Sequence, residues 1–148
     1  MTKSLFALVL TLGLGSFASA CAAQAPAAAP AINDAQIAHI AYTAGVIDVT
    51  AANQALQKSH NKAVRAFAEE MARDHTAVND QALALVKKLG VTPQDNPTSQ
   101  SLAGNAAAEQ KKLAALSGSA YDKAYIDNEV AYHKAVNEAL ADNLLPSA

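Results

Sequence analysis

Residues 64–89 read VRAFAEEMARDHTAVNDQALALVKKL, and this stretch decides the fold. Its apolar side chains recur three and four positions apart, which is the spacing of one face of an α-helix. That face consists of Val64, Phe67, Met71, Val78, Ala82, Leu85 and Leu89. Lys87 and Lys88 in the last turn, with Gly90 just beyond, are typical of a helix C-terminus. The stretch therefore predicts one long amphipathic helix.

Similar patterns lie on both sides of this helix. Asn33 and Gln36 resemble a capping box. They open a second helical pattern that runs through Ile37, Ile40, Ala44, Ile47, Ala51 and Ala55 and ends before residues 59–61. After a loop at residues 91–97, we expect an Ala-rich helix at about residues 99–116 and a last helix at about residues 120–143. Since no β-alternation of useful length appears, the sequence predicts an all-α antiparallel helical bundle.

The first residues are predicted to be a targeting segment. A basic start at Lys3, an apolar run over residues 5–14 and Ala18-Ser19-Ala20 fit a cleaved signal peptide over residues 1–20. Residues 21–32 are rich in Ala and Pro and predict an extended tether. Residues 33–148 then form one domain. These features predict export to the periplasm.

The only cysteine, Cys21, directly follows the predicted cleavage site. Ala18 to Cys21 resembles a lipoprotein processing box, although Ala18 stands where Leu is usual. Two hypotheses follow: a lipid anchor at Cys21 that holds the protein at the outer membrane, or plain cleavage into the periplasm. In both cases a single cysteine predicts a domain without a disulfide.

Composition excludes one class of partner. The formal charge of −2 and a pI near 6.0 give no basic surface for nucleic acid. There is no Trp, so we expect a core of Ala, Leu, Ile and Val. The sequence shows neither a nucleophile–base pattern nor a phosphate-binding loop, so nothing in it indicates a hydrolase or a transferase. The only enzymatic activity that we would consider is redox chemistry at a bound metal.

Ionisable side chains interrupt three of the predicted apolar faces. They are Asp48 on the first helix, His75 on the second, and Glu129 with His133 on the last. Such groups are costly to bury unless they are paired. Two carboxylates and two imidazoles form a donor set that Fe, Mn or Zn accepts. Asp74 lies nearer the edge of its helix, where it could orient a ligand or replace one.

A second interpretation of the same residues is structural. Buried Asp–His or Glu–His contacts also satisfy hydrogen bonds and fix helix register. The paired Glu-x-x-His repeats of di-iron bundles are absent. We expect His39 to face solvent and His60 to lie in a turn. Tyr121, Tyr125 and Tyr132 are expected to pack rather than carry electrons.

Two blocks of the chain resemble one known family. Residues 63–75 are similar to the "V-x-x-F-A-x-x-M-x-x-D-H" run of domain-of-unknown-function family 4142. Residues 116–133 resemble its "L-S-G-x-x-F-D-x-x-Y…V-x-x-H" block, with Tyr121 in place of the common Phe. The resemblance implies an exported bacterial protein, a ferritin-like bundle and no established activity.

The resemblance also carries expectations for single residues. The family's first-helix acid falls on Asp48, where Glu is usual, its Asp-His pair on Asp74 and His75, and its later His on His133. The family pattern continues with a further helix that carries another His, whereas this sequence ends at Ala148. We therefore expect a bundle that lacks the family's last helix and exposes an apolar face, which a second copy or a partner chain would cover.

Overall fold

The computed structural model describes residues 32–147, so the predicted signal peptide, Cys21 and nearly all of the tether lie outside the described residues. The described part is helical and contains no strand. Its helices are α1 (Asp34–Lys58), α2 (Lys62–Lys88), α3 (Pro97–Ala114) and α4 (Gly118–Ala139). A π-helical turn (Leu140–Leu144) and a 3₁₀ turn (Leu145–Ser147) follow α4. None of the described helices is both long and apolar enough to span a membrane.

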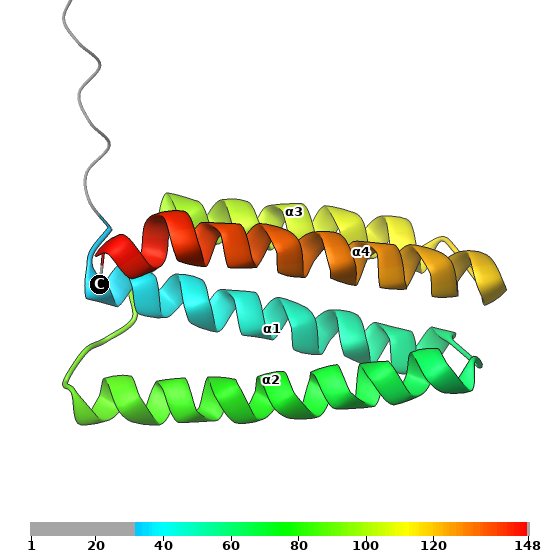
Figure 1. Ribbon diagram of the computed structural model, residues 1–148, viewed down its shortest axis with the longest axis horizontal. Coiled ribbons are helices and arrows are strands. Elements are labelled where there is room, and N and C mark those ends of the chain that lie inside the picture. The colour runs from blue at the N-terminus through cyan, green and yellow to red at the C-terminus, as the bar shows by residue number, and fades with distance from the viewer. Residues whose placement is uncertain (1–31, 148) are drawn as a thin grey trace, which may run out of the picture.

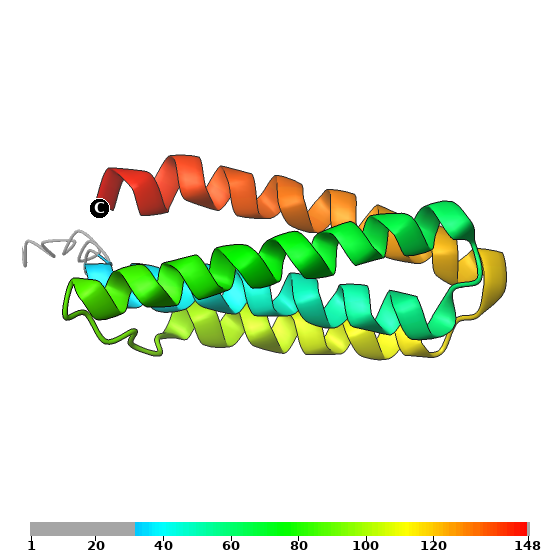
Figure 2. The same ribbon diagram turned by 90° about the horizontal axis from the view of Figure 1, so that it is seen from below.

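The four helices run alternately up and down, and α1 lies at the centre of the arrangement. Figure 1 shows α2 on one side of α1 and the pair α3 and α4 on the other. Helix α1 packs most extensively against α2 and also contacts α3 and α4, whereas the backbones of α2 and α4 stay further apart and their side chains meet, as in the Phe67–Tyr125 ring pair at 6.1 Å. Figure 2 shows α4 running along the edge of the molecule. The predicted all-α antiparallel bundle is confirmed.

Helices α1 and α2 begin where the sequence predicts. The Asn33 side chain accepts a hydrogen bond from the Gln36 amide (3.0 Å), and the Gln36 side chain accepts one from the Asn33 amide (3.1 Å). This reciprocal pair is the predicted capping box. Asn61 caps α2 by accepting from the amide of Ala63 at 2.9 Å. Both caps satisfy N–H groups that the first turn of a helix leaves free.

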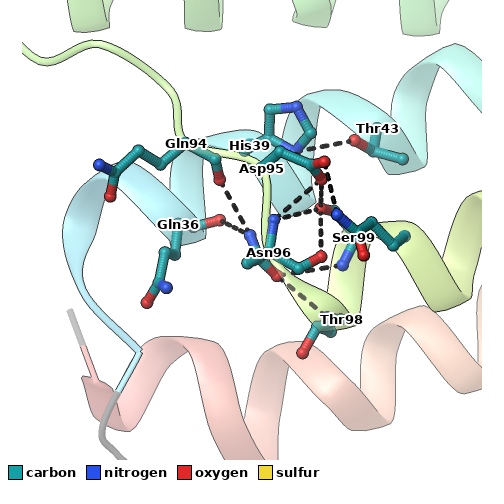
Figure 3. Close-up of polar contacts among 9 residues, drawn as sticks. Gln36, His39, Thr43, Gln94, Asp95, Asn96, Thr98 and Ser99 are labelled. Atoms are coloured by element: carbon teal, nitrogen blue, oxygen red, sulfur yellow. Dashed lines mark hydrogen bonds and ion pairs between the residues drawn. The ribbon is translucent and has the colours of Figure 1, made fainter.

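The connection from α2 to α3 is fastened to α1 by one buried side chain, Asn96 (Figure 3). Its carbonyl oxygen accepts from the amides of Thr98 and Ser99, while its NH₂ group donates to the backbone carbonyl of Gln36 at 3.3 Å. The backbone N–H of Gln94 donates a hydrogen bond to the backbone carbonyl of Ala35 at 2.8 Å. Asn96 therefore starts α3 and also attaches it to the first turn of α1.

The apolar core consists of four alanines, one valine, one leucine and two tyrosines. Its buried members are Ala51, Ala52, Ala55, Val64, Ala68, Leu113, Tyr121 and Tyr125. Alanines on α1 let α2 and α4 each approach α1 closely, and the tyrosine rings fill the remaining volume. The rings of Tyr121 and Tyr125 stack with centroids 6.2 Å apart. The expected packing role of these two tyrosines is confirmed.

Three expectations about the helices need correction. Helix α3 begins at Pro97 rather than near Ser99, because Asn96 is its cap and proline suits the first helical position. Helix α4 ends at Ala139, where the backbone widens into the π-helical turn. The apolar face of α2 is also not buried along its whole length. Val78, Leu85 and Leu89 remain 60%, 55% and 65% exposed because no helix covers that side of α2.

Candidate metal centre

Asp48 of α1, His75 of α2 and His133 of α4 meet in the middle of the bundle. Nδ1 of His75 lies 3.3 Å from Oδ2 of Asp48, and Nε2 of His133 lies 3.9 Å from Oδ1. One ligand atom from each residue falls within 4.8 Å of the others. The three side chains come from three helices and flank one point, so the predicted convergence of these residues is observed.

The orientation of the His133 ring is fixed by its own helix. Its Nδ1 lies 2.9 Å from the backbone carbonyl oxygen of Glu129. Because a carbonyl only accepts, the ring donates through Nδ1–H, and in the neutral ring Nε2 carries a lone pair. That lone pair is directed toward Asp48, whose Oδ1 is buried without a hydrogen-bond partner. Two acceptors thus face each other across 3.9 Å.

Burial also controls the protonation of the two acids. Desolvation raises the pKa of Asp48, and the neighbouring His75 and His133 oppose that rise. Glu129 is 2% exposed, and burial, with the Asp48 carboxylate nearby, raises its pKa to about 7. Oε2 of Glu129 has no hydrogen-bond partner and lies 4.0 Å from Nδ1 of His133. Glu129 is therefore adjacent to the cluster but is not one of its three convergent ligands.

The structure does not bring Asp74 into the cluster. Its carboxylate is half exposed and accepts a hydrogen bond from Nε of Arg73 at 2.8 Å, which holds its pKa below the usual value. Asp74 immediately precedes His75, and successive helical residues point about 100° apart. The rotation that turns His75 inward thus turns Asp74 toward solvent.

The other histidines lie away from the cluster. His60 is exposed in the turn between α1 and α2, as predicted. The expectation that His39 is solvated was wrong: its side chain is 28% exposed, and Nδ1 lies 3.8 Å from Asp95 and 3.5 Å from the Thr43 hydroxyl. The connection that carries Asp95 folds back over α1 and covers this ring (Figure 3). His39 thus belongs to the polar contacts around Asn96.

Two residues near the cluster were missed by the sequence analysis. Asn79 lies one turn after His75 and is 8% exposed, yet its side-chain carboxamide makes no hydrogen bond within residues 32–147. It packs against Gly45 of α1 so closely that a Cβ at Gly45 would lie 2.1 Å from Oδ1 of Asn79. A glycine inside a predicted helix was the available signal, because it marks a close approach of another group.

Two hollows flank the cluster, the smaller between α2 and α4 and the larger among all four helices. The smaller, about 500 Å³, is bounded by apolar side chains such as Phe67 and Ile126 and by Glu129. The larger, about 700 Å³, is lined by Asp48, His75 and His133 together. Tyr132 closes part of its wall and donates its hydroxyl to the carbonyl of Ala44 at 3.0 Å. All three convergent ligands are thus reachable from the larger cavity.

The family model described as Domain of unknown function (DUF4142) matches residues 19–148. The chain belongs to this family. DUF4142 thus covers the whole bundle, including every residue of the Asp48–His75–His133 cluster. Comparisons with curated proteins and with solved structures give no match, so the ferritin-like relationship stays a prediction.

Proposed function

We propose that this protein binds one divalent transition-metal ion through Asp48, His75 and His133. The observation that carries the proposal is the pair of facing acceptors, Oδ1 of Asp48 and Nε2 of His133. A buried acceptor without a donor is costly, and a cation between the two atoms would satisfy both at once. Glu129 lies outside these three ligands, 4.0 Å from Nδ1 of His133, and holds the rear of that ring through the backbone carbonyl of its own residue.

The donor set favours particular ions. Two imidazoles and one carboxylate suit Zn²⁺ and Fe²⁺, and Mn²⁺ also accepts them. Atoms bound tetrahedrally at about 2.0–2.2 Å lie roughly 3.3–3.6 Å apart, so the observed cluster, within 4.8 Å, needs a small contraction to close on an ion. The hydrogen bond from Nδ1 of His133 already fixes the ring for coordination through Nε2.

Metal analysis of matched variants tests this proposal. The purified protein is equilibrated with Zn²⁺, Mn²⁺ or Co²⁺, the last as a stable substitute for Fe²⁺, and bound metal is measured after gel filtration. We expect one ion per chain in the wild type and none in His75→Ala/His133→Ala. The double variant His39→Ala/His60→Ala removes the same number of imidazoles outside the cluster and should keep the ion. Equal binding by both double variants would refute the site.

A second candidate function is a non-catalytic interaction module in which the cluster only fixes helix packing. The exposed apolar side chains favour it: Val78, Leu85 and Leu89 on α2 and Val130 on α4 are each at least 55% exposed. Groups of exposed apolar side chains often mark contacts with another protein. Sedimentation of wild type and Val78→Ser/Leu85→Ser distinguishes the two cases, because a module that self-associates through α2 should dissociate in the variant.

The proposed location is the periplasm, with ferritin-like bundle architecture as the family resemblance implies. The proposal of export rests on the signal-peptide pattern of residues 1–20, and the alternative of a lipid anchor rests on Cys21. Fractionation of cells that express the full chain or Cys21→Ser tests both. An anchored protein moves from the membrane fraction to the soluble periplasmic fraction in the variant, whereas plain cleavage leaves both proteins soluble.

A further inference from the structure

The larger cavity opens directly onto the three ligands of the proposed metal centre. Asp48, His75 and His133 all line it, and its volume of about 700 Å³ lies within the range of small-molecule sites. Three protein ligands leave coordination positions free for an external group, as in catalytic rather than structural zinc sites. Those free positions would therefore face a space large enough for an organic ligand.

The charge of the centre selects the head group of such a ligand. A divalent ion with one carboxylate and two neutral imidazoles carries a net charge of about +1. The bottom of the cavity offers no further carboxylate beyond Asp48 among its lining residues, since Glu129 faces the smaller hollow. A ligand with one negative charge would neutralise the centre, whereas a cation would be repelled.

Asn79 supplies a second point of attachment. Its side chain lines this cavity, is more than nine-tenths buried and makes no hydrogen bond within the described chain. Gly45 is the reason the amide can lie there, because any larger residue would collide with it. A carboxylate can give one oxygen to the ion and accept a hydrogen bond from the Asn79 NH₂ group with the other.

The remaining walls determine the body of the ligand. They are mainly apolar, with a few polar groups such as Asn105, and their aliphatic side chains come from all four helices: Ile40 of α1, Val78 of α2, Leu102 of α3 and Val136 of α4. We propose that the cavity binds a small amphipathic monocarboxylate, with its head between the metal ion and Asn79 and its apolar chain along these walls. This inference rests on the proposed metal function and adds the class of ligand.

Cobalt-loaded full-length protein provides the test, because the visible absorption of bound Co²⁺ changes when its ligands change. We use decanoate as the probe, with decanol and acetate as controls for its head and its tail. Decanoate should change the spectrum with saturation at one molecule per chain, decanol should leave it unchanged, and acetate should bind at least tenfold more weakly. An equal response to decanoate and acetate would refute the role of the cavity walls.

Variants separate this inference from the metal proposal. Asn79→Leu should keep one Co²⁺ per chain and weaken decanoate about tenfold, the order expected for a lost hydrogen bond to a charged group. Asn105→Leu, an exposed carboxamide at the same cavity, should bind decanoate as the wild type does. Val136→Trp fills the cavity from α4 and should block decanoate even if Asn79→Leu folds poorly.

The outcomes are distinct for the two proposals. Bound cobalt whose spectrum ignores decanoate refutes the ligand inference and leaves the metal centre intact. Failure to bind cobalt refutes the metal centre and the ligand inference with it. Unchanged decanoate affinity in both Asn79→Leu and Val136→Trp would show that the carboxylate binds outside this cavity.

Discussion

His133 uses its two ring nitrogens for different purposes. Nδ1–H is held by the carbonyl of Glu129 one turn earlier, so Nε2 is left for Asp48 or for an ion. This division follows from the i, i+4 spacing on α4, because a helical side chain leans back toward the preceding turn. A single local hydrogen bond thus sets the chemical character of the whole cluster.

Glu129 should make the stability of the metal-free protein fall as pH rises. Its pKa is near 7 in the folded chain against 4.5 in the unfolded one, so between these values the folded state binds more protons. The free energy of unfolding therefore decreases with pH across that window, by on the order of 3 kcal/mol in total. Urea denaturation from pH 4.5 to 8 with a chelator present measures this slope.

Glu129→Gln removes the titrating group and should flatten that slope. The raised pKa of Asp48 contributes with the same sign, so a smaller dependence on pH should remain. Glu138→Gln replaces an exposed carboxylate on the same helix and serves as the control, with the wild-type slope expected. An unchanged slope in Glu129→Gln would contradict the role given to its burial.

The sequence predicted the cluster residues for a physical reason. Asp48, His75 and His133 each lie on the apolar side of a helix, and a bundle turns those sides toward one another. The role of Asn79 could not be predicted in the same way. Its environment depends on how closely α1 and α2 approach at Gly45, and that distance is a property of the pair of helices rather than of either sequence pattern.

At the scale of the helices, Gly45 of α1 and Asn79 of α2 form a close contact between the two helices. A Cβ at residue 45 would lie 2.1 Å from Oδ1 and 2.8 Å from Cγ of Asn79, so Gly45→Ala should displace the Asn79 carboxamide from its buried position and cost about 1–3 kcal/mol. In an Asn79→Ala background the same change should be neutral or stabilising by up to about 1 kcal/mol, because alanine favours helix over glycine. Thermal denaturation of the four proteins measures this coupling.

Gly104→Ala is the matched control for that cycle. Gly104 lies inside α3, and a Cβ added there would meet no neighbouring atom within 4 Å, so the substitution should stabilise the protein in any background. Equal losses from Gly45→Ala with and without Asn79 would contradict the proposed contact and place the strain elsewhere in α1.

Asn96 and Asn61 allow two helix caps to be compared. Both accept hydrogen bonds from the first turn of their helix, but Asn96 also donates to the carbonyls of Gln36 and Gln94. Asn61→Ala should cost about 1 kcal/mol, and Asn96→Ala about 2 kcal/mol because buried partners lose their donor. Urea denaturation of the two variants gives these values, and equal losses would contradict the attachment of α3 to α1.

The helix boundaries show which features of the fold could be predicted from local sequence and which could not. The start of α1 follows from two side chains that are close together in the sequence, so the capping box was predictable. The start of α3 depends on Asn96, whose buried position requires the backbone of α1 as a partner. The exposed half of α2 is a similar case. Its periodicity predicts an apolar face, but only the arrangement of the other helices decides whether that face is covered.

At the scale of the molecule, α1 stands between α2 and α4, and these outer helices meet through side chains such as Phe67 and Tyr125 rather than through close backbone packing. Asp48 of α1, His75 of α2 and His133 of α4 are a polar link between the outer helices, beside the apolar contact of Phe67 with Tyr125. An ion bound by all three residues would join the outer helices to each other as well as to α1. Metal binding should accordingly be visible as a change in global stability.

Saturating metal should raise the thermal midpoint of the wild-type protein. An ion at a hundred times its Kd adds about 2.7 kcal/mol when it binds only the folded state, which corresponds to roughly 8–15 °C for a domain of this size. The shift, measured by differential scanning calorimetry with and without Zn²⁺, should vanish in His75→Ala/His133→Ala and persist in His39→Ala/His60→Ala. If the cluster variant keeps the full shift, the stabilising ion binds elsewhere on the chain, because the remaining carboxylate of Asp48 alone cannot hold the outer helices together.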